Sequence, residues 1–396
     1  MALSLTGDST MYAVLASQID VVGIGLGVVG LLLGANRMIR IPGNLMAGAL
    51  YDRSRRRPLF LLGLSLGIVS TLSYSLVRGF WPLLLGRVLW GIAWSLINVG
   101  GYTMILDRST AVDRGRMTGL YQMAFMLGLT ISPILGGALT DTLGFRSAVR
   151  ICALVSSIGL VVTLAALPET RPRWVEGSHP AWGKLDGQRL LHWANRLRRI
   201  DRRMLAASYI YFATLFVSSG VLMSTLGLYL ERRWGSDIAV GSTVIGVASL
   251  AGVMLGMRAL LGIVAGPVAG ALSDRLGDRW PVVRGGILLG AGGFLTLAFL
   301  GGVGAVPTGV AAVSLGAGAL AATLAAIAGD MAQGGRRGVT MGGLATAGDI
   351  GSALGPPLAY ALAVTLDLRW VYLFCTLVLA SGLMAAAGQG RRRIKI

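Results

Sequence analysis

Long apolar runs alternate with short polar connections along most of this 396-residue chain. The runs are near 20 residues, the length with which an α-helix crosses a hydrocarbon core of roughly 30 Å. The pattern therefore predicts an all-α integral membrane protein with twelve transmembrane helices. The expected spans are 1–19, 22–51, 58–78, 80–106, 117–140, 146–167, 204–230, 238–272, 281–300, 304–327, 338–366 and 369–388. The first is barely long enough, and no basic segment of the kind that opens a cleavable signal peptide precedes its apolar residues.

Composition supports a membrane protein and argues against other classes. Hydrophobic residues make up 54% of the chain and charged residues 13%, whereas a soluble domain carries about 25% charge. The 59 glycines suit membrane helices that pack closely through small residues. Cys152 and Cys375 lie in apolar runs and are expected to be buried free thiols. The chain shows no metal-ligand spacing, and the glycine-rich stretch Gly23–Gly30 lies inside a span, so we expect no cofactor, no metal and no enzyme activity.

The basic residues are distributed unevenly between the two sides of the expected membrane. The net charge is +18, and 25 of the 35 Lys and Arg residues fall in the even-numbered loops and the C-terminal tail. About six lie on the opposite side and four within spans. The positive-inside rule places the basic loops and both termini in the cytoplasm. The charge is thus an orientation signal, which argues against nucleic-acid binding and predicts a multi-pass protein of the cell (inner) membrane.

One long polar stretch divides the chain. Within it, Leu190, Trp193, Leu197 and Ile200 recur at helical spacing among arginines, which predicts a basic amphipathic helix on the cytoplasmic surface. The expected organisation is an N-terminal six-helix bundle (1–167), a linker (168–203), a C-terminal six-helix bundle (204–388) and a basic tail (389–396).

The two halves are related by an internal repeat. Asp52 and Asp274 are 222 residues apart, and Pro133 and Pro356 are 223 apart. Offsets of 223 also relate three further pairs, namely Arg146 and Arg369, Cys152 and Cys375, and Asp107 and Asp330. Such a constant offset indicates two similar halves, the parallel-repeat plan of a large class of transporters.

Three motifs carry a resemblance over essentially the whole chain. "GALYDRSRRR", Gly48–Arg57, resembles the loop signature G-x-x-x-D-R-x-G-R-R of the major facilitator superfamily, with Arg55 in place of Gly; "GALSDRLGDR", Gly270–Arg279, is a weaker copy. "RVLWG", Arg87–Gly91, resembles the fourth-helix motif R-x-x-x-G. "GLTISPILGG", Gly128–Gly137, resembles the fifth-helix signature of proton-coupled antiporters, with Ser132 in place of Gly. The resemblance implies transport of a small molecule by alternating access.

The resemblance also implies roles for residues outside the cavity. The two loop copies are expected to form a conformational latch, with Gly48, Asp52, Arg53 and Arg57 in the first copy and Gly270, Asp274 and Arg275 in the second. An ordinary positive-inside anchor is the alternative, and it explains Arg55–Arg57 equally well. Small residues and prolines in spans 5 and 11 mark a hinge or packing seam between the halves: Gly128, Pro133, Gly136, Gly137, Gly351, Gly355 and Pro356.

Charged residues inside spans are the remaining candidates, because a charge in the bilayer interior normally faces a cavity or a partner. Asp8 and Arg87 have no evident counterpart in the other half and are our leading pair for proton coupling; a static ion pair is the alternative. Asp349 is a second candidate proton site, or a polar cap beside Gly348. The remaining three, which could bind an anionic substrate or instead snorkel or pair with loop acids, are Arg37, Arg40 and Arg258.

The sequence therefore favours a secondary transporter, most simply a monomer that exports an amphipathic small molecule in exchange for protons. Two alternatives stay open. One is uptake of a polar or anionic metabolite by symport. The other is a transporter-like sensor that moves no substrate. The partners expected are a small molecule, protons and the lipid bilayer.

Overall fold

The fold was obtained as a computed structural model that describes residues 1–110, 113–170, 201–240, 243–300, 302, 304–331 and 337–389. The first half contains the helices α1 (Thr6–Val14), α2 (Ile19–Val22), α3 (Leu26–Arg53), α4 (Arg56–Leu76), α5 (Phe80–Arg108), α6 (Arg114–Leu143) and α7 (Phe145–Ala166). The second half contains α9 (Arg202–Leu215), α10 (Met223–Trp234), α11 (Val247–Leu276), α12 (Trp280–Phe299), α13 (Ala305–Met331), α14 (Arg337–Thr365) and α15 (Leu368–Ala387).

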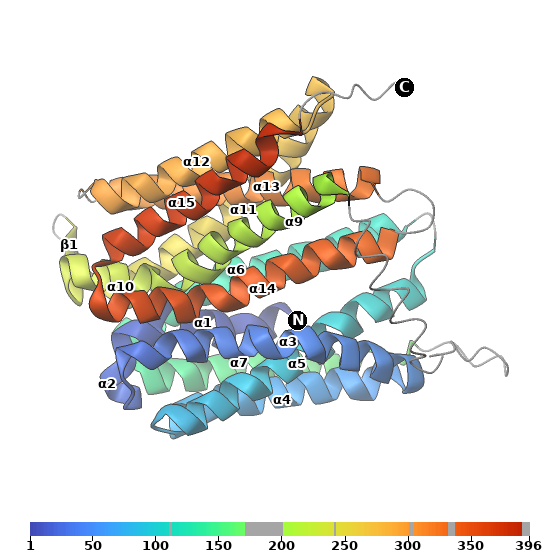
Figure 1. The fold of residues 1–396 in the computed structure, drawn as a ribbon. Helices are drawn as coiled ribbons and strands as arrows, with labels where there is room; N and C mark the ends of the chain where they lie inside the picture. Colours follow the sequence, from blue (N-terminus) through green and yellow to red (C-terminus); the bar gives the residue numbers. More distant parts are fainter. Residues whose placement is uncertain are drawn as a thin grey trace, which may run out of the picture.

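The all-α membrane fold with twelve spans is confirmed. Within the described residues, nine helical segments are long and apolar enough to cross a membrane. The first span, α3 and α14 complete the expected twelve. Figure 1 shows the second half above and most helices of the first half (α1, α3, α4, α5 and α7) below, while α6 of the first half extends up among the helices of the second. Cys152 and Cys375 are buried free thiols, as expected.

The eighth span begins later than the sequence suggested. Residues expected to open it form an antiparallel hairpin of β1 (Asp237–Val240) and β2 (Thr243–Gly246), with Asp237 opposite Gly246. The helix starts only at Val247. Thr243, Val244 and Ile245 are β-branched, and such residues favour a pleated strand over a helix.

Two expected spans are also interrupted. The first consists of short 3₁₀ and α segments, Ala2–Leu5, Thr6–Val14, Leu15–Gln18 and Ile19–Val22. The seventh contains a π-helical segment, η3 (Phe216–Leu222), between α9 and α10. Such π segments inside α-helices often occur at functional sites. The predicted amphipathic helix around Trp193 and most of the predicted basic tail lie outside the described residues.

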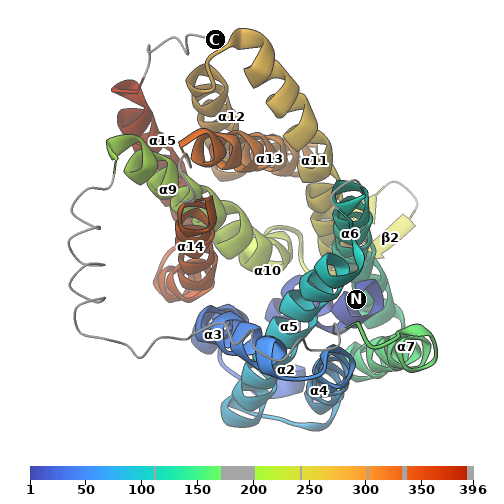
Figure 2. The same ribbon diagram turned by 90° about the vertical axis from the view of Figure 1, so that its right-hand side faces the viewer.

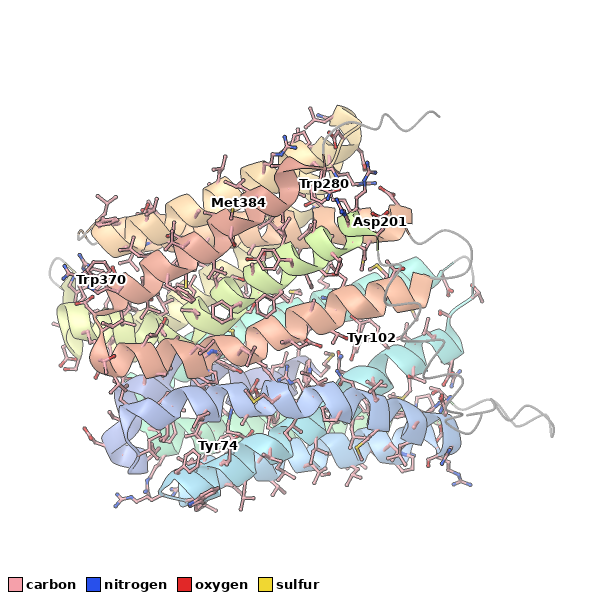
Figure 3. The ribbon with its side chains drawn as sticks, viewed as in Figure 1. Tyr74, Tyr102, Asp201, Trp280, Trp370 and Met384 are labelled. Atoms are coloured by element: carbon pink, nitrogen blue, oxygen red, sulfur yellow. The ribbon has the colours of Figure 1, made fainter. Side chains whose placement is uncertain are left out.

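Two ends of the molecule serve as reference points below. The hairpin end carries β1 and β2 and the start of α15 at Trp370; the linker end carries the start of α9 near Asp201 and the start of α12 at Trp280. Figure 3 labels Trp370 at one end and Asp201 and Trp280 at the other.

Two helix pairs join the halves, α3 with α14 and α6 with α11. Figure 2, viewed from the linker end, shows both pairs side by side. At the hairpin end their backbones touch: a Cβ at Gly30 would meet the carbonyl oxygen of Pro356, and a Cβ at Gly252 that of Pro133. Small residues permit this close approach of helix backbones.

Towards the linker end the same helices separate. A Cβ at Gly119 in α6, Gly270 in α11 or Gly342 in α14 would meet no described atom within 4 Å. Met123 and Leu260, which continue the α6–α11 pair in this direction, are 60% and 54% exposed. The structure is therefore closed between its halves at the hairpin end and open at the linker end.

Candidate functional site

A cavity of about 370 Å³ lies between the two halves. The first half contributes residues of α1, α3, α5 and α6, and the second contributes residues of η3 and four helices, α9, α10, α11 and α14. Five of the six charged residues that the sequence placed within spans line it: Asp8, Arg37, Arg40, Arg258 and Asp349. Apolar side chains complete the wall, chiefly Leu5, Trp94, Phe125, Leu129, Leu215, Met223 and Leu255.

Arg87, the sixth, lies behind this wall in contact with Asp8. Its side chain is fully buried, and its Nη1 donates to Asp8 Oδ1 at 2.6 Å. Its Nε donates to the carbonyl oxygen of Leu32 at 3.0 Å. Gly91, one turn further along α5, makes this possible because a Cβ there would meet the backbone of Asn36 in α3. The structure thus brings together the Asp8–Arg87 pair that the sequence suggested.

Asp8 has two further partners. The side-chain amide of Asn36, which is completely buried, donates to Asp8 Oδ1 at 2.9 Å. Arg40 Nη2 approaches Asp8 Oδ2 at 3.5 Å, and the Arg40 guanidinium also stacks over the Trp94 ring at 5.0 Å. One carboxylate therefore balances two guanidinium groups, one buried and one facing the cavity.

Tyr12 connects the pair to Arg37. The Tyr12 hydroxyl lies 2.9 Å from the carbonyl oxygen of Leu33 and accepts from Arg37 Nε at 3.0 Å. Both Arg37 and Arg87 lie against its ring face, with centroid distances of 5.1 and 5.3 Å. Arg37 Nη2 reaches Met223 Sδ of the second half at 3.3 Å. Arg37 therefore spans the boundary between the halves.

Arg258 and Asp349 face the cavity from the second half. Arg258 Nη2 donates at 2.8 Å to Ser219 Oγ, which belongs to the π-helical segment of the seventh span. Asp349 lies on α14 within electrostatic reach of Arg40 and Arg37. It has no direct contact with Asp8, so the two carboxylates occupy opposite walls of the cavity. Among the described residues, Arg40 Nε and Arg258 Nε have no hydrogen-bond partner.

Sequence reasoning missed Asn36, Tyr12 and Ser219. Asn36 was detectable, because an uncharged polar residue next to Arg37 inside a span also needs a polar partner. Tyr12 and Ser219 gave no comparable signal, since both residue types are common in apolar helices and only the fold shows which face they occupy.

Each of the two loop signatures contributes an arginine to an ion pair at an equivalent position in its half, and the sequence analysis missed both pairs. Arg56 Nε contacts Asp107 Oδ2 at 3.1 Å, and Arg279 Nε contacts Asp330 Oδ2 at 2.7 Å. Each pair ties a loop to the end of a helix in its own half. Arg56 and Arg279 are 223 residues apart, as Asp107 and Asp330 are, so the repeat offset could have identified them.

The remaining members of the predicted latch lie around these pairs. Asp274 contacts Arg279 Nη1 at 3.1 Å, and Arg57 Nη2 donates to the carbonyl oxygen of Leu164 at 2.5 Å. Asp52, Arg53 and Arg275 are exposed at the linker end, and a Cβ at Gly48 or Gly270 would find open space. Because the structure is open at this end, a contact between the halves there belongs to a different conformation and stays a prediction.

The predicted seam residues divide into two groups. Gly137, Pro133 and Pro356 contact the opposite half, at Ala248, Gly252 and Gly30 respectively. The others pack within their own half: Gly128 against Ala2 and Leu5, Gly136 against Thr10, Gly351 against Phe212, and Gly355 against Gly220. Only the first group faces the opposite half, whereas the sequence suggested a single packing surface.

Two helical bundles that meet around a charged cavity, open at one end and closed at the other, define a membrane transporter rather than an enzyme. The family model described as Major Facilitator Superfamily matches residues 1–258 and 248–391. The chain belongs to the major facilitator superfamily.

Curated relatives are distant. The class B tetracycline resistance protein of Escherichia coli is 26% identical over 335 residues, which cover 76% of this chain and 81% of that protein. Major facilitator superfamily domain-containing protein 10 of Mus musculus is 24% identical over 349 residues, 83% of this chain and 72% of the relative. Citrate exporter 1 of Aspergillus niger is 28% identical over 123 residues, which span only 24% of the exporter's length.

Solved structures share the fold. A bacterial homologue of the human lysosomal transporter Spinster, in an inward-facing and occupied conformation, matches with a TM-score of 0.73 at 15% identity, covering 98% of this chain and 93% of that one. The human organic anion transporter MFSD10 matches with a TM-score of 0.62 at 20% identity, covering 97% of both chains.

Proposed function

We propose that the protein exports a small amphipathic organic anion in exchange for protons. The observation that carries this proposal is the charge around the cavity. Arg37, Arg40 and Arg258 line it from both halves, and Asp8 and Asp349 supply only two negative charges. With Arg87 behind the wall, four guanidinium groups face two carboxylates.

An unbalanced positive charge inside a membrane protein is costly, and an anionic substrate would offset it. Arg40 Nε and Arg258 Nε are donors without partners among the described residues, and the two side chains come from opposite halves. A carboxylate held between them would use the planar fork of donors that guanidinium offers to such groups. The apolar wall formed by Trp94, Phe125, Leu129 and Leu255 suits the rest of an amphipathic molecule.

Orientation and direction are part of the same proposal. The excess of Lys and Arg in the loops at the linker end supports a cytoplasmic location for that end, in which case the cavity of this structure opens to the cytoplasm. The name of the citrate exporter, which aligns with 31% of this chain, is consistent with outward transport. Proton exchange is assigned to Asp8, which on this proposal is ionised while the substrate is bound and carries the proton on the return step. Uptake by symport is the competing mode, and it predicts the opposite response to a pH gradient.

Purified protein in proteoliposomes tests the proposal. Radiolabelled p-aminohippurate, an amphipathic carboxylate, and tetraphenylphosphonium serve as an anionic and a cationic probe, each measured with a pH gradient of either sign and compared with protein-free liposomes. We expect accumulation of the anion opposite to the proton gradient and no transport of the cation. Loss of one guanidinium–carboxylate contact costs roughly 1.5–3 kcal/mol, so Arg258→Gln is expected to raise the KM for the anion about 10- to 100-fold.

The matched control is Arg369→Gln, which removes an exposed arginine at the start of α15, far from the cavity lining. It is expected to leave KM unchanged. Transport of tetraphenylphosphonium with no transport of p-aminohippurate would contradict the anion assignment. Anion movement along the proton gradient would contradict export and favour symport.

A further inference from the structure

A carboxylate of the first half caps a helix of the second. Asp141, in the last turn of α6, accepts a hydrogen bond through Oδ2 from the backbone N–H of Ser249 at 2.6 Å. Ser249 is the third residue of α11. The contact joins the two halves at the hairpin end, where the structure is closed.

The sequence of α11 leaves this position open. The first N–H groups of a helix have no partner within it, and a side-chain oxygen near the N-terminus usually supplies one. The residue before α11 is Gly246, which has no side chain to offer. A Cβ at Gly246 would collide with the Asp141 carboxyl group. Because Gly246 has no side chain, the first N–H groups of α11 stay available, and there is room beside them for an acid from another helix.

The electrostatics of its own helix, α6, do not favour an acid at the position of Asp141. A negative charge in the last turn of α6 is unfavourable, because the C-terminus of a helix already carries partial negative charge. At the N-terminus of α11 the same charge is favourable. The position is explained by the partner helix.

The repeat does not require this contact either. The position 223 residues after Asp141 is Val364, which packs against Gly27 at the start of α3 in the other seam. One seam of the hairpin end thus ends in an apolar contact and the other in a charge-assisted hydrogen bond. Because the hydrogen bond occurs between α6 and α11 and not between α3 and α14, the repeated architecture of the two halves does not explain it.

We propose that Asp141 is a positioning residue that stabilises the conformation closed at the hairpin end. When the halves separate there, α6 and α11 move apart and the bond to Ser249 breaks, because its two ends belong to different bundles. Water then replaces the carboxylate at the helix N-terminus. The cap therefore favours the state that is open at the linker end, and it acts at the opposite end from the predicted latch at Asp52. The inference needs only the rocking of the two halves and is independent of the substrate.

The experiment measures the populations of the two states directly. Spin labels at Met117 in α6 and Leu276 in α11, both exposed at the linker end, report the opening between the halves by double electron–electron resonance in nanodiscs. Loss of a helix cap typically shifts an equilibrium about fivefold, which corresponds to about 1 kcal/mol. Asp141→Ala is expected to shift the ratio of long to short distances by this factor towards the short, linker-closed state.

Two further variants and a control make the outcome decisive. Asp141→Asn keeps an acceptor without the charge and is expected to give a smaller shift, about twofold. Gly246→Ala is expected to shift the populations in the same direction as Asp141→Ala, because the added Cβ displaces the carboxylate. Thr142→Ala is the matched control, since Thr142 is exposed and its hydroxyl donates to carbonyl oxygens of its own helix, those of Ala138 and Leu139.

A cap that serves stability alone predicts a different result. Asp141→Ala would then lower the melting temperature and leave the distance distribution unchanged, and this outcome overturns the proposal. An equal shift in Thr142→Ala would overturn it as well.

Discussion

The Asp8–Arg87 pair gives the sharpest prediction, because the two residues differ in the partners that remain when the other is removed. Asp8→Asn leaves two guanidinium groups without their negative partner. Arg87 is fully buried, and the partners that remain to it, the Leu32 carbonyl and the ring face of Tyr12 among them, carry no negative charge. Breaking a buried ion pair by removal of one partner costs about 3–5 kcal/mol. We expect Asp8→Asn to lie near the lower limit, about 3 kcal/mol, since the asparagine oxygen can still accept from Arg87.

Arg87→Gln is expected to be less costly. Asp8 then keeps Arg40 at 3.5 Å and the Asn36 amide at 2.9 Å. The loss is one charge-assisted hydrogen bond, about 2 kcal/mol. Thermal unfolding in detergent, followed by the fluorescence of Trp94 and the other tryptophans, gives the ranking of the two variants.

Transport separates proton coupling from a static pair. If Asp8 exchanges the proton, Asp8→Asn abolishes uphill transport driven by a pH gradient but preserves downhill exchange in proteoliposomes. The double variant Asp8→Asn/Arg87→Gln then recovers stability without recovering uphill transport. Recovery of pH-driven accumulation in the double variant would refute the coupling role and leave Asp349 as the next candidate. Equal destabilisation by the two single variants would refute the inference that Asp8 serves two cations.

Three other predictions concern conformational change and orientation. Gly252→Ala places a methyl group against the Pro133 carbonyl oxygen and is expected to reduce transport at least tenfold, whereas Gly292→Ala in α12, which meets no described atom within 4 Å, should leave it unchanged; equal activity of the two would show that the seam accommodates a methyl group. Asp52→Asn is expected to impair transport more than Asp274→Asn, with insertion in the membrane unaffected, and unimpaired transport in both variants would reduce the loops to anchors. In a background with Cys152 and Cys375 replaced by serine, cysteines at Arg55 and Gln389 should react only with reagents on the cytoplasmic side and a cysteine at Asp237 only from outside; the reverse pattern would overturn the orientation.

Hydropathy predicted the twelve spans because each must bury its backbone in lipid, and that requirement acts on every span alike. The errors occurred where local chemistry competes with this rule. The stretch Asp237–Gly246 is apolar enough to continue a span, yet it forms a hairpin in front of α11. Likewise, no residue between Phe216 and Leu222 marks the widened π-helical turn that presents Ser219 to Arg258.

For the cavity, charge was the useful signal. Five of the six charges placed within spans line one cavity, and Arg87 pairs with a residue that does. Their partners could not be predicted in the same way. Whether Asn36 faces Asp8 or lipid depends on the rotation of α3, which Gly91 of α5 sets through backbone contact. Asp141 gave no signal, because its meaning comes from a helix start more than a hundred residues away.

The glycine and proline contacts between α3 and α14, and between α6 and α11, have a consequence for how such a protein can diversify. Backbone meets backbone there at Gly30, Gly137 and Gly252, and a larger side chain at any of them would collide with a carbonyl oxygen. Pro133 belongs to both the seam and the cavity wall, but the rest of the wall is built from other positions. We therefore expect movement of the halves and recognition of the substrate to depend on largely different residues. We expect substitution of wall residues such as Trp94, Phe125 or Leu255 to change the substrate, while the glycines at which the two halves meet stay unchanged.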